Sequence, residues 1–499
     1  MNRASVISIR GRVEDAPWRP GPREVEQRAV RGVVLLVGRT GGLQALTLAG
    51  TIALARLLTP RDYGTFAIAL TTQQFGRFIV DLGLPTALIR RHEDMTVREE
   101  HAVAGLAASG ASAVAALLLL VAFVFLPLAG VRSVVLRVAA VTALALPLYT
   151  ARIIPTIRLE RRLEFGKMVV IEVAETIAFY AFAIPAAVLG LGPFSLAGAI
   201  VVGAALSSLV ATFIRPWRFG WSVDLGAVRS MLGFSLRASL LAPIQLLREL
   251  LALVVLAVVG GPALSGYYNL AARLFSLQLS ISYAVQRVAL TAFSRGESSD
   301  ERNRQGARAV VVTSLLAAFP VAVVAASARV LVVVAFGQRW APTVGVVEWA
   351  ALGWLIMSGV TSVLVSLALA HGDARVPLRA MLAQAVVVVG AAAGLGAAVG
   401  PRGAGMAVTL GALTGAVMLV WSNKSVRGAS LATTVRIFLV TAGAVVIATR
   451  VPEAKTLPGL AGAIAVSGVI WIALATVLMR GELIRSKRLL ARHLRISPR

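Results

Sequence analysis

The longest apolar runs in this sequence limit its fold more than any other feature. Residues 102–131 and 380–401 contain no charged side chain, and about 20 apolar residues are enough for a helix to cross a bilayer. The rest of the chain agrees, because 58% of its 499 residues are hydrophobic and its mean hydropathy is +0.82. Since a membrane-spanning helix satisfies its backbone hydrogen bonds internally, we predict an all-α, polytopic membrane protein.

Apolar segments of this length recur along the chain and predict about fourteen transmembrane helices. Their approximate bounds are 32–58, 63–84, 102–128, 133–156, 166–189, 193–214, 231–259, 263–291, 308–335, 343–370, 376–399, 403–422, 430–449 and 458–479.

The basic residues test this count, because Lys and Arg gather in the cytoplasmic loops of membrane proteins. With the N-terminus in the cytoplasm, the predicted cytoplasmic segments hold 32 of the 49 Lys and Arg residues, and the predicted outer turns hold 7. One missed or extra helix would exchange the two sides from that point on. The pattern therefore favours an even number of helices, with both termini in the cytoplasm.

The same distribution accounts for the net charge of +26. In a soluble protein that charge would suggest nucleic-acid binding, but here it marks topology, so we expect no nucleic-acid partner. The chain has no cysteine, and its four histidines lack a metal-binding spacing. It also has no phosphate-binding Gly-Lys-Ser/Thr loop and no large outer loop for catalytic groups. We therefore expect neither an enzyme nor a metal site.

Two turns indicate an internal repeat. Residues Pro60–Ala69 (PRDYGTFAIA) align with Pro262–Ala271 (PALSGYYNLA), six predicted helices later. An even offset makes the two halves parallel, related by an axis along the membrane normal. The predicted organisation is a basic cytosolic tail (1–29), an N-terminal six-helix half (30–229), a C-terminal six-helix half (230–422), helices 13 and 14 (423–479) and a second basic cytosolic tail (480–499).

Several short motifs resemble those of one transporter family. They are LARLLTPRDYG at 54–64, DLGL at 81–84, the Arg90-Arg91 pair, LERRLEF at 159–165, GLGPFSLAG at 190–198 and FGQRW at 336–340. Together they resemble bacterial oligosaccharide flippases of the O-antigen and exopolysaccharide (Wzx-type) kind, the polysaccharide transporter family of the MOP flippase superfamily. The resemblance implies a MATE-like fold, with two six-helix bundles and two further helices at the C-terminus.

Polar side chains inside the apolar spans predict a water-filled passage between the halves. Asn269, Arg273, Ser276, Ser280, Tyr283 and Arg287 recur every three or four residues and share one helix face. An intramembrane arginine costs about 2.5 to 3.5 kcal/mol on insertion scales, so it should face protein or water. The alternatives are hydrogen bonds within a dry bundle and arginines that reach the lipid headgroups. The predicted cavity residues are Arg39, Gln44, Gln73, Arg77, Arg237, Gln245, Arg248, Asn269, Arg273, Ser276 and Tyr283.

Three intramembrane carboxylates have two possible roles. Glu172 and Glu175 lie three residues apart on one predicted helix, and Asp81 lies four residues after Arg77. They are candidate sites for H⁺ or Na⁺ coupling. The alternative, which we favour for the two glutamates, makes them counter-charges for arginines such as Arg39 or Arg77.

A passage lined by arginines suits an anionic cargo, because a guanidinium binds phosphate oxygens through paired hydrogen bonds. The resemblance implies such a cargo, a polyprenyl-diphosphate-linked oligosaccharide, flipped across the bacterial cytoplasmic membrane by alternating access for polysaccharide biosynthesis. Its expected partners are this lipid, the bilayer, a polysaccharide polymerase and glycosyltransferases, with no cofactor besides a coupling ion. The alternatives are a flippase for a lipid-linked peptidoglycan precursor and an antiporter of cationic drugs.

Overall fold

The computed structural model describes residues 42–81, 96–128, 133–162, 164–217, 220, 241–276, 278, 298–423, 428–450 and 456–478. Every regular element within these ranges is a helix, which confirms the predicted all-α class. The predicted positions of Arg39, Arg237, Ser280, Tyr283 and Arg287 lie outside the described residues.

The helices follow the predicted segments in order. In the N-terminal half they are the helix Gly42–Leu57, α2 (Pro60–Asp81), α4 (Val97–Leu120), η1 (Val121–Phe125), α5 (Leu126–Leu128), α6 (Val134–Ala143), α7 (Ala145–Thr150), α8 (Ile153–Arg161), α9 (Phe165–Val188) and α10 (Pro193–Ile214). In the C-terminal half they are α12 (Leu241–Leu274), α14 (Ser299–Ala326), α15 (Ala328–Leu331), η2 (Val332–Phe336), η3 (Gln338–Trp340), α16 (Thr343–Ile356), η4 (Met357–Thr361), α17 (Ser362–Ala370), α18 (Arg375–Val399) and α19 (Pro401–Ser422). The chain continues with α20 (Ala429–Ala448) and α21 (Leu457–Leu478).

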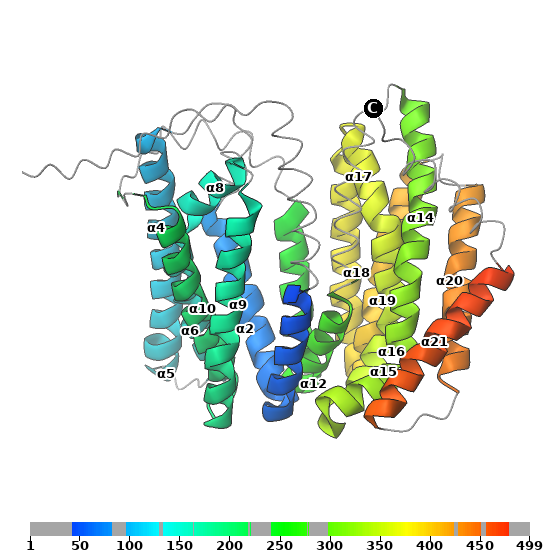
Figure 1. The fold of residues 1–499 in the computed structure, drawn as a ribbon, viewed down its shortest axis with the longest axis horizontal. Helices are drawn as coiled ribbons and strands as arrows, with labels where there is room; N and C mark the ends of the chain where they lie inside the picture. The colour runs from blue at the N-terminus through cyan, green and yellow to red at the C-terminus, as the bar shows by residue number, and fades with distance from the viewer. Residues whose placement is uncertain are drawn as a thin grey trace, which may run out of the picture.

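The helices form two groups. Figure 1 shows α4 to α10 together on one side and α14 to α21 on the other, with α2 and α12 between them. Helices α2 and α12 pack against each other, so they join the two groups.

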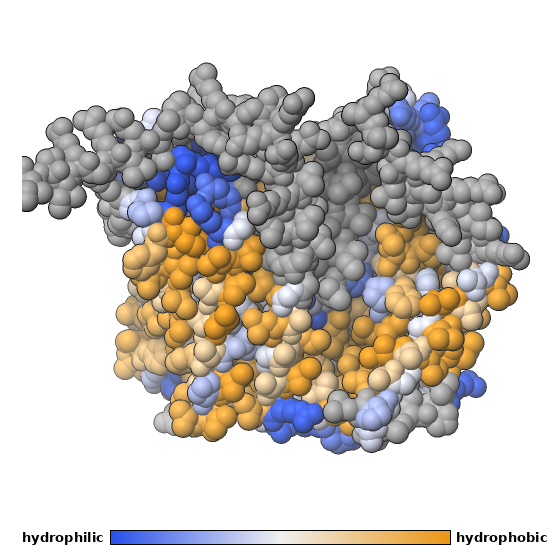
Figure 2. Space-filling model, viewed as in Figure 1, coloured by the Kyte–Doolittle hydropathy of each residue, from blue (hydrophilic) through white to orange (hydrophobic). Residues whose placement is uncertain are grey.

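The outer surface suits a lipid environment. Figure 2 shows apolar side chains over most of the visible face, with hydrophilic ones toward its upper and lower edges. Large apolar side chains such as Leu189 and Phe213 are 79% and 76% exposed. A soluble monomer rarely exposes so continuous an apolar surface, whereas lipid covers it without cost.

The predicted count of fourteen spans is not confirmed by length and hydropathy alone. Ten of the described helices pass that test, or eleven when the bent pair Val134–Thr150 and Ile153–Arg161 is taken as one span. Helix α2 is not among them, and the first segment is described only as the shorter helix Gly42–Leu57. The test also takes Pro243–Leu274 as one helix.

Helix α12 is nevertheless two antiparallel helices. Its backbone leaves the helical region at Gly261, where φ is 77° and ψ is 166°, and Pro262 follows. The Ser265 hydroxyl donates to the Leu253 carbonyl at 2.7 Å, although twelve residues of straight helix would separate these groups by about 18 Å. The chain therefore reverses here, as the predicted segments 231–259 and 263–291 require.

The first predicted turn has the same contact. The Tyr63 hydroxyl donates to the Thr51 carbonyl at 3.3 Å, and Thr51 and Tyr63 stand 202 positions before Leu253 and Ser265. In both turns, a hydroxyl three residues after the proline thus reaches a carbonyl of the preceding helix. The domain bounds remain a prediction, but these two hairpins are built alike.

The two hairpins meet through their glycines. A Cβ atom on Gly64 would overlap the Pro262 carbonyl and lie 2.8 Å from the Gly266 nitrogen, while a Cβ on Gly266 would overlap the Pro60 carbonyl and lie 3.2 Å from the Gly64 nitrogen. Each glycine therefore lies against the backbone of the other hairpin. No residue with a side chain can stand at either position without moving the helices apart.

We predict that Gly64→Ala and Gly266→Ala each lower the apparent melting temperature of the purified protein. Forcing a methyl group into backbone contact should cost about 1–3 kcal/mol or more. Gly390→Ala is the matched control, because nothing lies within 4 Å of a Cβ at this helical position and the change should stabilise by about 0.5–1 kcal/mol. Thermal unfolding followed by tryptophan fluorescence measures the difference. Equal melting temperatures in all three variants would show that the crossing is not tight.

Candidate functional site

A cavity of about 340 Å³ lies between the first helix and the C-terminal half. Its walls are Leu43, Gln44, Thr47, Leu48 and Thr51 from the helix Gly42–Leu57, and Leu270, Arg273, Leu274, Ser276 and Phe336 from the C-terminal half. One guanidinium and several uncharged polar groups therefore face the same space, and none of these lining residues is acidic.

Arg273 is the charged group of this cavity. Its Nε donates to Asn269 Oδ1 at 3.2 Å, and its Nη1 lies 3.5 Å from the Thr51 hydroxyl of the other half. Its guanidinium also lies 5.9 Å from the centre of the Tyr63 ring. All of these contacts are with neutral groups. Within the described ranges Arg273 forms no ion pair. A guanidinium held in this way keeps donors for an anion.

The predicted cavity residues have different positions in the structure. Gln44, Arg273 and Ser276 line the cavity, and Asn269 adjoins it through Arg273. The lining residues do not include Gln73, Arg77, Gln245 or Arg248.

The other predicted cavity residues described in α2 and α12 are buried or half-buried. Gln73 is 4% exposed on α2, and the structure shows no hydrogen-bond partner for its amide nitrogen. Arg248 Nη2 lies 3.9 Å from Oε2 of its neighbour Glu249. Asp81 ends α2, and its side chain is outside the described part.

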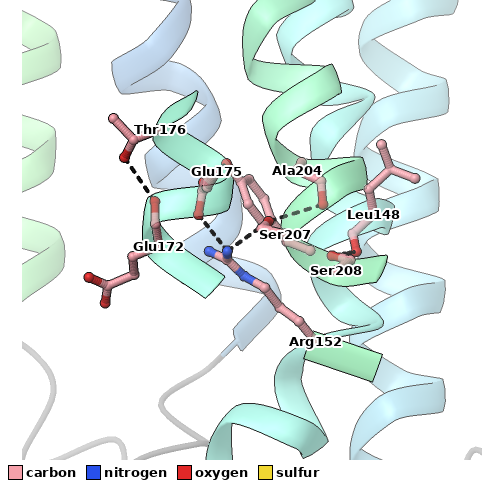
Figure 3. Close-up of polar contacts among 9 residues, drawn as sticks. Leu148, Arg152, Glu172, Glu175, Thr176, Ala204, Ser207 and Ser208 are labelled. Atoms are coloured by element: carbon pink, nitrogen blue, oxygen red, sulfur yellow. Dashed lines mark hydrogen bonds and ion pairs between the residues drawn. The ribbon is translucent and has the colours of Figure 1, made fainter. Parts of the chain in front are cut away.

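A second polar cluster lies within the N-terminal half. Arg152 Nη1 and Glu175 Oε2 form an ion pair at 2.5 Å, and the same nitrogen donates to the Ser207 hydroxyl at 2.9 Å (Figure 3). The Tyr149 hydroxyl donates to the other oxygen of Glu175 at 2.7 Å. Both oxygens of this carboxylate are therefore engaged, and its charge is balanced by Arg152.

Arg77 belongs to this cluster and not to the cavity wall. The guanidiniums of Arg77 and Arg152 lie 4.7 Å and 4.5 Å from the centre of the Tyr149 ring, a distance at which the ring attracts a cation. The two arginines thus share one tyrosine. Glu172 points away from Arg152 in Figure 3, so the two glutamates of α9 have separate surroundings.

Sequence reasoning missed Tyr149, Arg152 and Ser207. A signal was present, because Arg152 lies in the predicted span 133–156, and its burial requires a partner. Periodicity placed Glu175 on a polar face but could not identify which arginine faces it, since that depends on how three helices pack. The lining residue Phe336 was likewise known only as part of the FGQRW motif.

No metal centre emerges from the described residues, which contain no group of three or more His, Asp or Glu side chains placed to hold a metal ion. The polar groups described above orient one another through hydrogen bonds, and Arg152 and Glu175 neutralise each other's charge.

The sequence profile of the polysaccharide biosynthesis protein family matches residues 53–345, which is more than half of the chain. The chain belongs to this family. This assignment agrees with the polysaccharide transporter family that the motifs at the turns resemble.

A curated relative agrees with this assignment. The succinoglycan biosynthesis transport protein ExoT of Rhizobium meliloti (strain 1021) is 30% identical over 342 residues, which cover 64% of this chain and 66% of that relative. The match therefore spans slightly less than two thirds of the relative's length.

The structural likeness extends further along the chain. It covers 90% of this protein and 100% of the lipid II flippase MurJ in an inward closed conformation, with a TM-score of 0.74 and 14% identity. A multidrug resistance MATE family transporter of the MOP superfamily, in an inward-facing conformation, matches 79% of this chain and 95% of its own, with a TM-score of 0.58 and 14% identity. The TM-scores show a shared fold, which confirms the predicted MATE-like architecture.

We predict that Arg152 and Glu175 behave as one unit in thermal unfolding. Arg152→Met and Glu175→Gln should each destabilise this polysaccharide biosynthesis protein, because each leaves one charge of a largely buried pair without its partner. With side chains 14% and 26% exposed, we expect losses of about 1–3 kcal/mol and a double variant at least about 1 kcal/mol more stable than additivity requires.

The matched control is the pair Arg329 and Glu348, which lies at 3.3 Å with Arg329 66% exposed. The same double-mutant cycle should give a coupling of about 0–1 kcal/mol there. Additive losses at Arg152 and Glu175 would mean that the two groups do not stabilise each other.

Proposed function

We propose that this polysaccharide biosynthesis protein flips a polyprenyl-diphosphate-linked oligosaccharide across the bacterial cytoplasmic membrane by alternating access. The cargo would serve an exopolysaccharide or O-antigen-type polymer. No covalent bond changes in this process, so the protein acts as a transporter. The observation that carries the proposal is Arg273, an arginine held by neutral groups at a cavity between two similarly built hairpins.

The chemistry of the cavity supports an anionic head group with hydroxyl-rich neighbours. A diphosphate needs charge-assisted donors, which Arg273 supplies, while Gln44, Thr47 and Ser276 offer donors and acceptors suited to sugar hydroxyls. The volume of about 340 Å³ is that of a small-molecule pocket, which suits the part of the cargo nearest the lipid. The polyprenyl tail would stay in the bilayer.

The same wall argues against a cationic drug as cargo. A site for a cation would offer carboxylates to the ligand. The described lining residues contain no carboxylate, and Arg273 would repel a positive charge. The curated relative is named for succinoglycan transport, which also favours a polysaccharide precursor. The likeness to MurJ is one of fold and does not bring its substrate to this chain.

Alternating access would require a driving force that differs between the two states. We propose H⁺ or Na⁺ as the coupling ion, with Glu172, Glu175 and Asp81 as the candidate groups. The cytoplasmic location of both termini and cooperation with a polymerase and glycosyltransferases belong to the same proposal.

We predict that Arg273→Ala lowers polymer export by at least about tenfold in cells that depend on this protein, because the diphosphate loses its charged donor. Arg273→Lys should retain part of the activity, since it keeps the charge but not the paired geometry. Surface polysaccharide and accumulated lipid-linked precursor are measured together, with membrane levels of each variant as a check.

Arg450→Ala is the control, because it removes the same charge from an exposed position after α20, in the part of the chain outside the repeat. It should export normally. Normal export by Arg273→Ala at equal membrane levels would remove this arginine, and the proposed anion site, from the transport pathway.

A further inference from the structure

Two arginines cross between the halves at the turns predicted to face outward. Arg56, near the end of the helix Gly42–Leu57, donates from Nε to the Ala335 carbonyl at 2.9 Å and from Nη2 to the Val334 carbonyl at 2.5 Å. Arg339 donates in the opposite direction, from Nη2 to the Arg56 carbonyl at 3.0 Å and from Nη1 to the Leu58 carbonyl at 3.4 Å. The contact is therefore reciprocal.

All four acceptors lie at helix ends. Val334 and Ala335 are in the last turn of η2, which Gly337 ends with a φ of 98°, and Arg56 and Leu58 lie where the first helix stops. The last carbonyls of a helix have no partner within it and carry the negative end of its dipole. A guanidinium is a favourable partner for them. Each half thus supplies the cap for a helix of the other.

Trp340 fills the space between these caps. It is fully buried, and its Nε1 donates to the Ala55 carbonyl at 2.8 Å. Its ring meets the edges of Tyr63 and Tyr267 at centroid distances of 5.1 Å and 6.3 Å. The indole therefore contacts both hairpin turns at once, and the carbonyls of residues 55, 56 and 58 are all bound by the 339–340 segment.

We propose that Arg56, Arg339 and Trp340 form an outer clasp that closes the cavity toward the outside and must be released before cargo can leave. The clasp adjoins the cavity directly, because Phe336, which lines the cavity, follows the acceptor Ala335. The inference rests on the proposed function, since it assigns one of the two closures that alternating access requires.

The chemistry of the clasp suits repeated opening. Within the described part of the chain, neither arginine is paired with a carboxylate, so separation leaves no buried acid behind. The freed guanidiniums and carbonyls can all be hydrated at the membrane surface.

The test measures the distance between the halves without any cargo. Because the natural chain has no cysteine, Leu189→Cys and Val399→Cys give two unique sites for spin labels, both exposed and at the end of the halves where the clasp lies. Double electron–electron resonance in lipid nanodiscs then reports the ratio of open to closed distances. Arg56→Ala and Arg339→Ala should each raise this ratio at least about tenfold.

Arg61→Ala is the matched control, because it removes the same charge from the adjacent exposed turn, and the clasp does not use it. It should change the ratio less than about twofold. Arg56→Lys and Arg339→Lys keep the charge and protect folding, yet a single ammonium cannot reproduce the guanidinium fork, so they should give intermediate ratios. Trp340→Phe, which keeps an aromatic ring but removes the Nε1 donor, should also shift the ratio toward open.

An unchanged distance distribution in the folded alanine variants, or in the lysine variants should alanine prevent folding, would overturn the clasp. This outcome is separate from failure of the proposed function. Distances are recorded without cargo, whereas the proposed function fails if Arg273→Ala exports normally. If the clasp opens as predicted but export does not depend on Arg273, the protein is a gated transporter of another substrate.

Discussion

The contact between Gly64 and Gly266 sets how closely the two halves approach. Each glycine lies against the backbone of the opposite hairpin, so the helices cross at a distance that no side chain permits. Arg273 stands seven residues after Gly266, or about 10 Å along the helix. Leu270, which also lines the cavity, lies four residues after Gly266, so the cavity begins about one helical turn from this crossing. A wider crossing at the glycines would leave Thr51 and Arg273 too far apart to enclose it.

Four arginines of this protein are balanced in three different ways. Arg152 is neutralised by Glu175 and fixed by Ser207 and Tyr149. Arg56 and Arg339 bind carbonyls at helix ends, where the helix dipole supplies the opposite partial charge. Among the described residues, Arg273 has only neutral hydrogen-bond partners. Of these four, it is the one that faces a cavity and keeps most of its charge for a ligand.

The sequence predicted the helices and the paired turns well, because both depend on local features. Apolar length defines a span, and Pro60 and Pro262 with their following glycines define the hairpins. Periodicity also placed Arg273 and Ser276 on one face. It could not show that Arg77 turns toward Tyr149 instead of the cavity, because that depends on how the helices pack. The family motif FGQRW gave no hint of its contacts, since its partners are backbone atoms 281 to 285 positions earlier.

Those backbone acceptors have an evolutionary consequence. Arg56, Arg339 and Trp340 all bind carbonyl oxygens, which every amino acid carries, so substitution at positions 55, 334 or 335 leaves the acceptor in place. Only the donor side chains are constrained by these bonds. Related sequences should therefore show no compensating pairs of changes between the two segments. Methods that infer proximity from correlated substitution would overlook this clasp, even though its hydrogen bonds join residues 278 to 285 positions apart in sequence.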